Sequence, residues 1–281
     1  MTWWCSASGT AWTWSWQAYP GVWLVVGALL GAYFWLVNQD ADPTSSRERS
    51  LFVAGVLLLW IALDWPVGAL GAGYLLSVHQ LQYVLLVLIV PPLLLLGTPV
   101  WLLRRVARLR MVGPVIQRIT RPVPAILLCN AIVVLTHLPT VVDSLMVSQL
   151  GSFILDLSWL MAGLVLWWPA LSRIPECNAL SYGGRFGYLL VATLIPSLPA
   201  AFFFFSDFPI YRLYELAPPL RGWTARDDQF VAGAVMKFGS FVVVLFALSV
   251  IFFQWYRSEE REAPIVSSTS ATDANTLPVS D

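Results

Sequence analysis

Charge is scarce in this 281-residue chain, and so is histidine. Charged residues make up 11% of the sequence, and only two histidines are present. Soluble domains carry about 25% charged residues, so a water-soluble domain is excluded as the main body of the chain. The 16 basic residues balance the 16 acidic ones. Without an excess of positive charge, we expect no nucleic-acid partner.

The motifs of hydrolases and nucleotide-binding enzymes are also missing. The sequence contains no G-x-S-x-G, no H-E-x-x-H and no phosphate-binding loop, so we predict that the protein is not an enzyme. No Cys-x-x-Cys pair is present either. Cys5, Cys129 and Cys177 are expected outside the membrane, within it and inside the cell. Three thiols so placed form no disulfide framework within one chain.

Long apolar runs are what the sequence does contain. Hydrophobic residues reach 58% and the mean hydropathy is +0.72. A membrane-spanning helix needs about 20 mainly apolar residues. Candidate runs without the alternating polarity of strands lie at 21–37, 51–66, 74–96, 122–139, 149–172, 184–205 and 229–256. We therefore predict an all-α, polytopic membrane protein with a seven-helix transmembrane domain over residues 21–256.

The arginines indicate an orientation for this bundle. Arginine-rich loops remain in the cytoplasm, which places the Arg104–Arg121 connection inside, the N-terminus outside and the C-terminus inside. The other basic residues of the inner connections and of the C-terminal segment then also lie inside: Arg47, Arg49, Arg173, Arg185, Arg257 and Arg261. Only Arg212, Arg221 and Arg226 lie in outer loops. The Arg104–Arg121 cluster is also expected to contact acidic lipid headgroups.

The two ends of the chain differ in composition. Residues 1–20 are rich in tryptophan, which prefers the membrane–water interface, so we expect an interfacial anchor. A docking strip for a partner protein is the alternative. Residues 257–281 are polar, rich in serine and threonine, and interrupted by prolines. This composition predicts a disordered cytoplasmic tail.

Ionisable residues in the predicted spans, or directly beside them, cluster toward the outer side. They are Asp64, His79, His137, Asp156, Asp207, Asp227, Asp228 and Lys237. Such residues are expensive in a membrane and are candidates for function. Two imidazoles on neighbouring helices, with Asp156 nearby, could bind copper or zinc, or hold a haem iron between them.

Each of these residues also has a structural interpretation. Tyr83 is one helical turn from His79 and could donate a hydrogen bond to it. His137 could cap the carbonyls at its own helix end. Lys237 is expected to neutralise Asp156 or Asp64, because an unpaired ammonium in hydrocarbon costs several kcal/mol.

Two adjacent prolines, Pro91 and Pro92, interrupt the third apolar run. Proline removes a helical hydrogen bond and clashes with the preceding turn. We expect a kinked exit from the helix, with the freed carbonyls bonded by neighbouring helices or water.

The segment SVHQLQYVLLVLIVPPLLLLGTP, residues 77–99, resembles the signature of the CtaG family, polytopic assembly factors of bacterial caa-type cytochrome c oxidases. Further segments resemble the family in the same order, over most of residues 51–256: NAIVVLTHLPTVVDSL, MAGLVLWWPAL, SDFPIYRLY and RDDQFVAGAVM. The last contains Asp228, Gln229 and Met236, which match or adjoin the D-Q-x-x-x-G motif that opens the family's final helix.

The resemblance implies an assembly factor of the bacterial cytoplasmic membrane that matures the oxidase, with oxidase subunits as partners and copper as the metal supplied. Together with the polar residues of the outer side, it leads us to predict a site at His79, His137 and Asp156, lined by Tyr83, Asp64, Asp228, Gln229, Met236 and Lys237. Three family histidines are replaced, since Tyr83, Ser152 and Asp156 stand at their positions, and Lys237 replaces a usual tryptophan. Either Asp156 substitutes for an imidazole, or Asp156 and Lys237 form an ion pair in a protein that keeps only a metal-free scaffolding role. A haem-binding electron-transfer protein is the third possibility.

Overall fold

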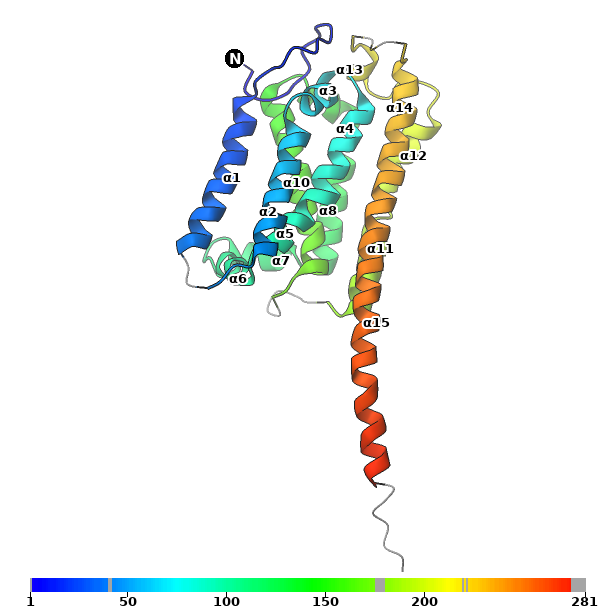
Figure 1. Cartoon of the computed structure of the whole chain (residues 1–281). Coiled ribbons are helices and arrows are strands. Elements are labelled where there is room, and N and C mark those ends of the chain that lie inside the picture. Colours follow the sequence, from blue (N-terminus) through cyan, green and yellow to red (C-terminus); the bar gives the residue numbers. More distant parts are fainter. Residues whose placement is uncertain (1, 40–41, 175–179, 219, 221, 274–281) are drawn as a thin grey trace, which may run out of the picture.

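The computed structural model describes residues 2–39, 42–174, 180–218, 220 and 222–273, and this part of the chain is helical without strands (Figure 1). The all-α prediction is therefore confirmed for the described residues. The longer helices are α1 (Pro20–Gln39), α2 (Ser46–Leu63), α8 (Pro122–Thr136), α10 (Gln149–Leu171), α11 (Tyr182–Ala192), α12 (Ser197–Phe205), α14 (Ala225–Ala234) and α15 (Ser240–Asp273). Short helices α3 (Val67–Gly73), α6 (Val100–Ala107), α7 (Gly113–Ile119), α9 (Pro139–Leu145) and α13 (Arg212–Glu215) connect them.

Several helices are long and apolar enough to cross a membrane. Four qualify alone: α1, the segment Leu76–Gly97, α10 and the segment Ala225–Glu260. Two bent pairs, α2 with α3 and α7 with α8, raise the number to six among the described residues. The predicted continuous span at 184–205 is wrong, because α11 and α12 are separated by a turn at 193–196. Pro196 explains the break, since proline cannot donate the helical hydrogen bond and clashes with the preceding turn.

The segment Leu76–Gly97 is the central rod of the bundle. It consists of α4 (Leu76–Tyr83), the π-helical segment η1 (Val84–Ile89) and α5 (Val90–Gly97). Of its apolar window, 67% is buried, compared with 22% for α1. It packs against α2, α10 and α14. Most of the polar residues discussed below lie on this rod or point toward it.

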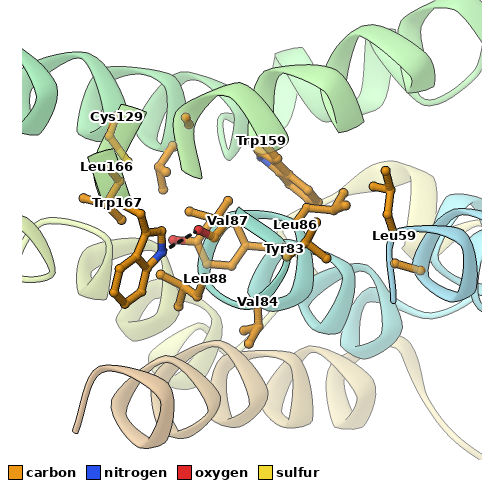
Figure 2. Close-up of a cluster of buried hydrophobic side chains, with 14 of the residues drawn as sticks. Leu59, Tyr83, Val84, Leu86, Val87, Leu88, Cys129, Trp159, Leu166 and Trp167 are labelled. Carbon is orange, nitrogen blue, oxygen red and sulfur yellow. Dashed lines mark hydrogen bonds between the residues drawn. The ribbon is translucent and has the colours of Figure 1, made fainter. Parts of the chain in front are cut away.

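Pro91 and Pro92 do not end this rod, which continues to Gly97. Proline at position 91 would leave the Val87 carbonyl without its helical donor. The indole Nε1 of Trp167 on α10 donates to that oxygen at 3.1 Å (Figure 2). The expectation that a neighbouring helix bonds a freed carbonyl is confirmed here. The chain does not leave the helix at the prolines, because α5 continues to Gly97 after the π-helical segment η1.

The bundle has two chemically different ends (Figure 1). Residues 2–19 lie across one end together with α3 and α13, and this is called the tryptophan-rich end. The Arg104–Arg121 segment, which includes α6 and α7, lies at the opposite end, called the arginine-rich end. The arginine-rich connection predicted from the sequence is thus two short helices.

The C-terminal helix differs from its prediction. α15 continues as helix to Asp273 and projects beyond the arginine-rich end (Figure 1), whereas disorder was predicted from residue 257. Residues 257–262 are mostly good helix formers. Extending a helix that has already formed adds one hydrogen bond for each residue, so α15 continues into this segment. The rest of the predicted tail, 274–281, lies outside the described residues.

Candidate functional site

The N-terminal segment folds onto the tryptophan-rich end of the bundle. The Trp3 carbonyl accepts from the Gly21 amide at 2.9 Å, and the Ala7 amide donates to the Met146 carbonyl at 3.0 Å. Trp4 is 2% exposed, so at least part of this segment is core and not only an interfacial anchor. Trp14, in contrast, is 71% exposed. The segment therefore closes the end of the bundle with one face and presents indoles with the other.

Two buried carboxylates are bonded by tryptophans from or near this segment. The Trp4 indole donates to Asp156 Oδ2 at 2.8 Å. Asp64 accepts from the indoles of Trp23 at 2.9 Å and Trp60 at 2.6 Å, and from the Trp65 amide. Buried carboxylates need donors, and neutral indole N–H groups can supply them.

The predicted ion pair of Lys237 with Asp156 or Asp64 is therefore wrong. Both carboxylates are bonded by N–H donors from tryptophans, which reach them from the folded-back N-terminal segment, from α1 and from α2. Lys237 and its neighbour Met236 lie on the π-helical segment η3 (Val235–Gly239) and line a cavity that they share with Tyr83. That cavity is separate from the carboxylates.

Asp228 fixes the beginning of the helix that carries His79. Its carboxylate accepts from the Leu76 amide at 2.6 Å, and from both the amide and the hydroxyl of Ser77. The first amides of a helix lack partners within the helix. A carboxylate from α14 therefore caps α4 across the bundle, and His79 follows within the same helical turn. Asp228 is a positioning residue for the imidazole.

The Asp228 cap yields a stability prediction. Asp228→Ala is expected to cost about 2–3 kcal/mol, because it leaves two N-terminal amides of α4 without their charged acceptor in a site that is 3% exposed. Asp227→Ala is the matched control, since Asp227 caps only its own helix through Thr224 at the surface and should cost about 1 kcal/mol. Thermal unfolding of the two purified variants measures the difference. Equal losses would contradict the role of Asp228.

His79 is buried and its ring nitrogens are unbonded. The residue is 1% exposed, and within the described part of the chain neither Nδ1 nor Nε2 has a hydrogen-bond partner. The predicted hydrogen bond from Tyr83 is therefore wrong. The ring instead packs on Trp159, with centroids 4.7 Å apart, and lies 6.0 Å from the Tyr214 ring. A buried imidazole of this kind keeps a lone pair available for another ligand.

His137 is bonded through both ring nitrogens. Its Nδ1 donates to the Val133 carbonyl at 2.7 Å, which confirms that it caps its own helix. The neutral ring then presents a lone pair at Nε2, which lies 3.1 Å from Oε1 of the Gln80 side-chain amide, and that oxygen is itself an acceptor. Rotating that amide by half a turn supplies an N–H donor to Nε2. His137 is thus held in place, whereas His79 is not.

The predicted three-ligand site does not form. Among the described residues, no group of three or more histidine, cysteine, aspartate or glutamate side chains is arranged to hold a metal ion. Both imidazoles pack on the Trp159 indole, His137 at a centroid distance of 5.7 Å, while Asp156 Oδ2 accepts from the Trp4 indole. Of the two described imidazoles, only that of His79 has ring nitrogens without a hydrogen bond to a described residue.

A loop between α12 and α14 is fastened to the same end of the bundle. Gln229 accepts from the Ile210 amide at 2.7 Å and donates to the Phe208 carbonyl. Tyr211 donates to the His137 carbonyl at 2.8 Å, and Tyr214 donates to the Gly71 carbonyl at 2.6 Å. Gln229 therefore braces the loop that places the Tyr214 ring beside His79.

Sequence reasoning missed three residues of this site: Trp4, Trp159 and Tyr214. Trp159 could have been found, because it lies three residues after Asp156 on one helix and shares its face. The contacts of Trp4 and Tyr214 bridge 152 and 143 residues of sequence, and no local pattern indicates them.

The comparison with protein families decides the identity of this bundle. The model of the cytochrome c oxidase caa3 assembly factor family (Caa3_CtaG) matches residues 28–258, which is most of the chain. The chain belongs to the CtaG family. The match begins within α1 and ends in α15, so the whole bundle around His79 has the family pattern. No curated protein and no solved structure matches the chain.

Proposed function

We propose that this CtaG-family chain helps to install copper in a caa3-type cytochrome c oxidase, at the tryptophan-rich end and on the outer face of the bacterial cytoplasmic membrane. The observation that carries this proposal is His79, a buried imidazole with no hydrogen bond at either nitrogen, in a family of oxidase assembly factors. Copper is cargo in this proposal, to be passed to oxidase subunits.

The incomplete ligand set supports transfer better than storage. A site with three fixed ligands would retain copper, whereas one available imidazole binds it weakly enough to release it to a stronger site. Neutral imidazole binds metal and protonated imidazole does not, so release is also favoured by acid. Asp228 and Trp159 hold the ring in position without bonding its nitrogens.

The distribution of arginine supports the orientation. The Arg104–Arg121 segment lies at the end opposite residues 2–19 (Figure 1). Arginine-rich segments stay in the cytoplasm, where they also meet acidic lipid headgroups. Labelling with a membrane-impermeant maleimide tests this in a cysteine-free background: Ser8→Cys should react from outside intact cells, and Arg110→Cys only after lysis. Both positions are exposed, so a reversed pattern would place the site on the cytoplasmic face.

The haem-binding alternative fits the geometry less well. Two axial imidazoles would have to leave the Trp159 indole, and His137 would have to give up the Val133 and Gln80 bonds. A purified protein with a Soret band would nevertheless establish it.

The metal content of the oxidase separates copper delivery from scaffolding. In a strain without this chain, we expect oxidase that contains haem but has at least about a fivefold lower copper-to-haem ratio. Plasmid-borne chain should restore the ratio, and excess copper in the medium should restore part of it. Elemental analysis of the purified oxidase measures the ratio. Less oxidase with a normal copper-to-haem ratio would contradict copper delivery and support a metal-free scaffold.

A further inference from the structure

A cavity within the apolar region of the bundle is not used by the proposed function. Its volume is about 220 Å³, and it lies between the central rod, α8, α10, α11 and α15. Its lining includes the polar or sulfur-containing side chains of Tyr83, Cys129, Met236, Lys237 and Ser240. Figure 2 shows Tyr83, Cys129 and Leu166 together in the buried core beside Trp167.

Three irregular helix segments converge on this cavity. Val87 and Leu88 belong to η1, Met236 and Lys237 to η3, and residues 193–196 form the break between α11 and α12. π-Helical segments are rare and occur frequently at functional sites. Broken helices at membrane depth are tolerated where they line a cavity, and they commonly form binding sites. Their convergence at one cavity indicates a binding site.

The rim of the cavity is apolar and faces away from the bundle. Leu190 and Leu194 of α11 and its following turn are 45% and 68% exposed, and Phe241 and Leu245 of α15 are 59% and 49% exposed. Exposed apolar side chains on spanning helices contact lipid. A ligand would therefore enter sideways from the hydrocarbon, with an apolar tail lying over these four residues.

The interior of the cavity presents hydrogen-bond donors. Tyr83 is 1% exposed and its side chain lines the cavity. Its ring is fixed by Trp159 and His137 at centroid distances of 5.5 and 5.1 Å. Ser240, which also carries a hydroxyl, lines the cavity as well. Donors of this kind select a ligand that carries acceptor oxygens.

Depth and size narrow the class of ligand. Lys237 is 12 residues from Ala225, the first residue of its span, which is about 18 Å along a helix. A hydrocarbon core is about 30 Å thick, so a phospholipid headgroup would be placed deep in hydrocarbon. A cavity of about 150 Å³ holds benzene. The larger cavity here has room for one substituted ring.

We infer that this cavity binds the ring of an isoprenoid quinone, with a carbonyl oxygen accepting from the Tyr83 hydroxyl and the hydrocarbon tail leaving between α11 and α15. A quinone ring is uncharged, carries two acceptor oxygens and is stable at mid-membrane depth. This inference does not depend on copper delivery, because it concerns a cavity that His79 does not line.

Titration of the purified full-length chain with decylubiquinone tests the inference, with tryptophan fluorescence as the signal. Saturable binding is expected for the natural sequence. Tyr83→Phe should weaken it about five- to tenfold, since it removes one donor and keeps the ring, and Ser240→Phe should abolish it by filling the cavity. Tyr33→Phe is the matched control, because Tyr33 bonds the Gly97 carbonyl and does not line the cavity.

The same titration with dodecane, which has the tail but no carbonyl, identifies the source of binding. Two results together would contradict the inference. The first is that Tyr83→Phe binds decylubiquinone as tightly as the natural chain does. The second is that dodecane displaces decylubiquinone equally well from both proteins, which would show that the cavity binds acyl chains. Mass spectrometry of lipid extracted from the purified chain should show a quinone. Phospholipid alone would overturn the inference without affecting the copper-to-haem test.

Discussion

His79→Phe is expected to lower the copper-to-haem ratio of the oxidase as much as removal of the whole chain does, about fivefold, without destabilising the chain. Phenylalanine has nearly the shape of histidine, so it keeps the packing on Trp159 and Tyr214. It removes two buried nitrogens that have no partner among the described residues, and burying such groups costs free energy. The variant should therefore be as stable as the natural chain, or more stable by about 1 kcal/mol.

His137→Phe is the matched control, and it should behave in the opposite way. It removes the bonds to the Val133 carbonyl and to Gln80, so it should cost about 2–3 kcal/mol. Thermal unfolding in detergent measures stability, and the copper-to-haem ratio of the oxidase measures function. Normal oxidase copper in a strain that carries His79→Phe would remove His79 from the proposed mechanism.

Gly163→Ala is expected to give the largest loss of stability, about 3 kcal/mol or more. A Cβ at this position would lie 2.5 Å from both the Val87 oxygen and Pro91 Cγ, and 2.8 Å from Val87 Cα. Backbone cannot move aside as a flexible side chain can, so α10 would have to separate from the central rod. That movement would also strain the Trp167–Val87 hydrogen bond, which satisfies the carbonyl freed by Pro91.

Gly27→Ala is the matched control for this glycine. Gly27 lies in α1, and a Cβ there meets no atom within 4 Å. Alanine favours helix over glycine by about 1 kcal/mol, so this variant should be neutral or slightly stabilised. Unfolding temperatures of the two variants in the same detergent give the comparison. A Gly163→Ala protein as stable as Gly27→Ala would show that α10 and the rod are not tightly packed.

Much of the helical architecture follows from local pattern. The apolar runs predicted at 21–37, 74–96, 122–139 and 149–172 coincide closely with helical segments. In a bilayer no water bonds the backbone N–H and C=O groups, so a spanning segment must bond them to one another within a helix. The break between α11 and α12 was missed, although Pro196 is visible in the sequence. Whether a proline interrupts a helix depends on whether a neighbouring residue donates a hydrogen bond to the carbonyl that the proline leaves without a donor. The Trp167 indole donates to the Val87 carbonyl, and the rod continues through Pro91.

The candidate site was predicted only in part. His79, His137 and Asp156 do lie in the buried core toward the tryptophan-rich end, but their partners were wrong in two of three cases. The hydrogen bond of His137 to its own helix was predictable because it is local. The pairing of Asp156 with Trp4 spans 152 residues and depends on how the N-terminal segment folds back.

The sequence by itself indicated that the chain lies in a lipid bilayer, where its main helices lie and which family it resembles. Low charge, the length of apolar runs and the order of motifs can all be read from the sequence directly. Only the tertiary structure decided which imidazole is available. Hydrogen bonding is a short-range and directional interaction, so whether a buried nitrogen is satisfied depends on which distant backbone or side chain packs within about 3 Å of it. Val133 and Gln80 lie that close to His137, and no described residue bonds His79.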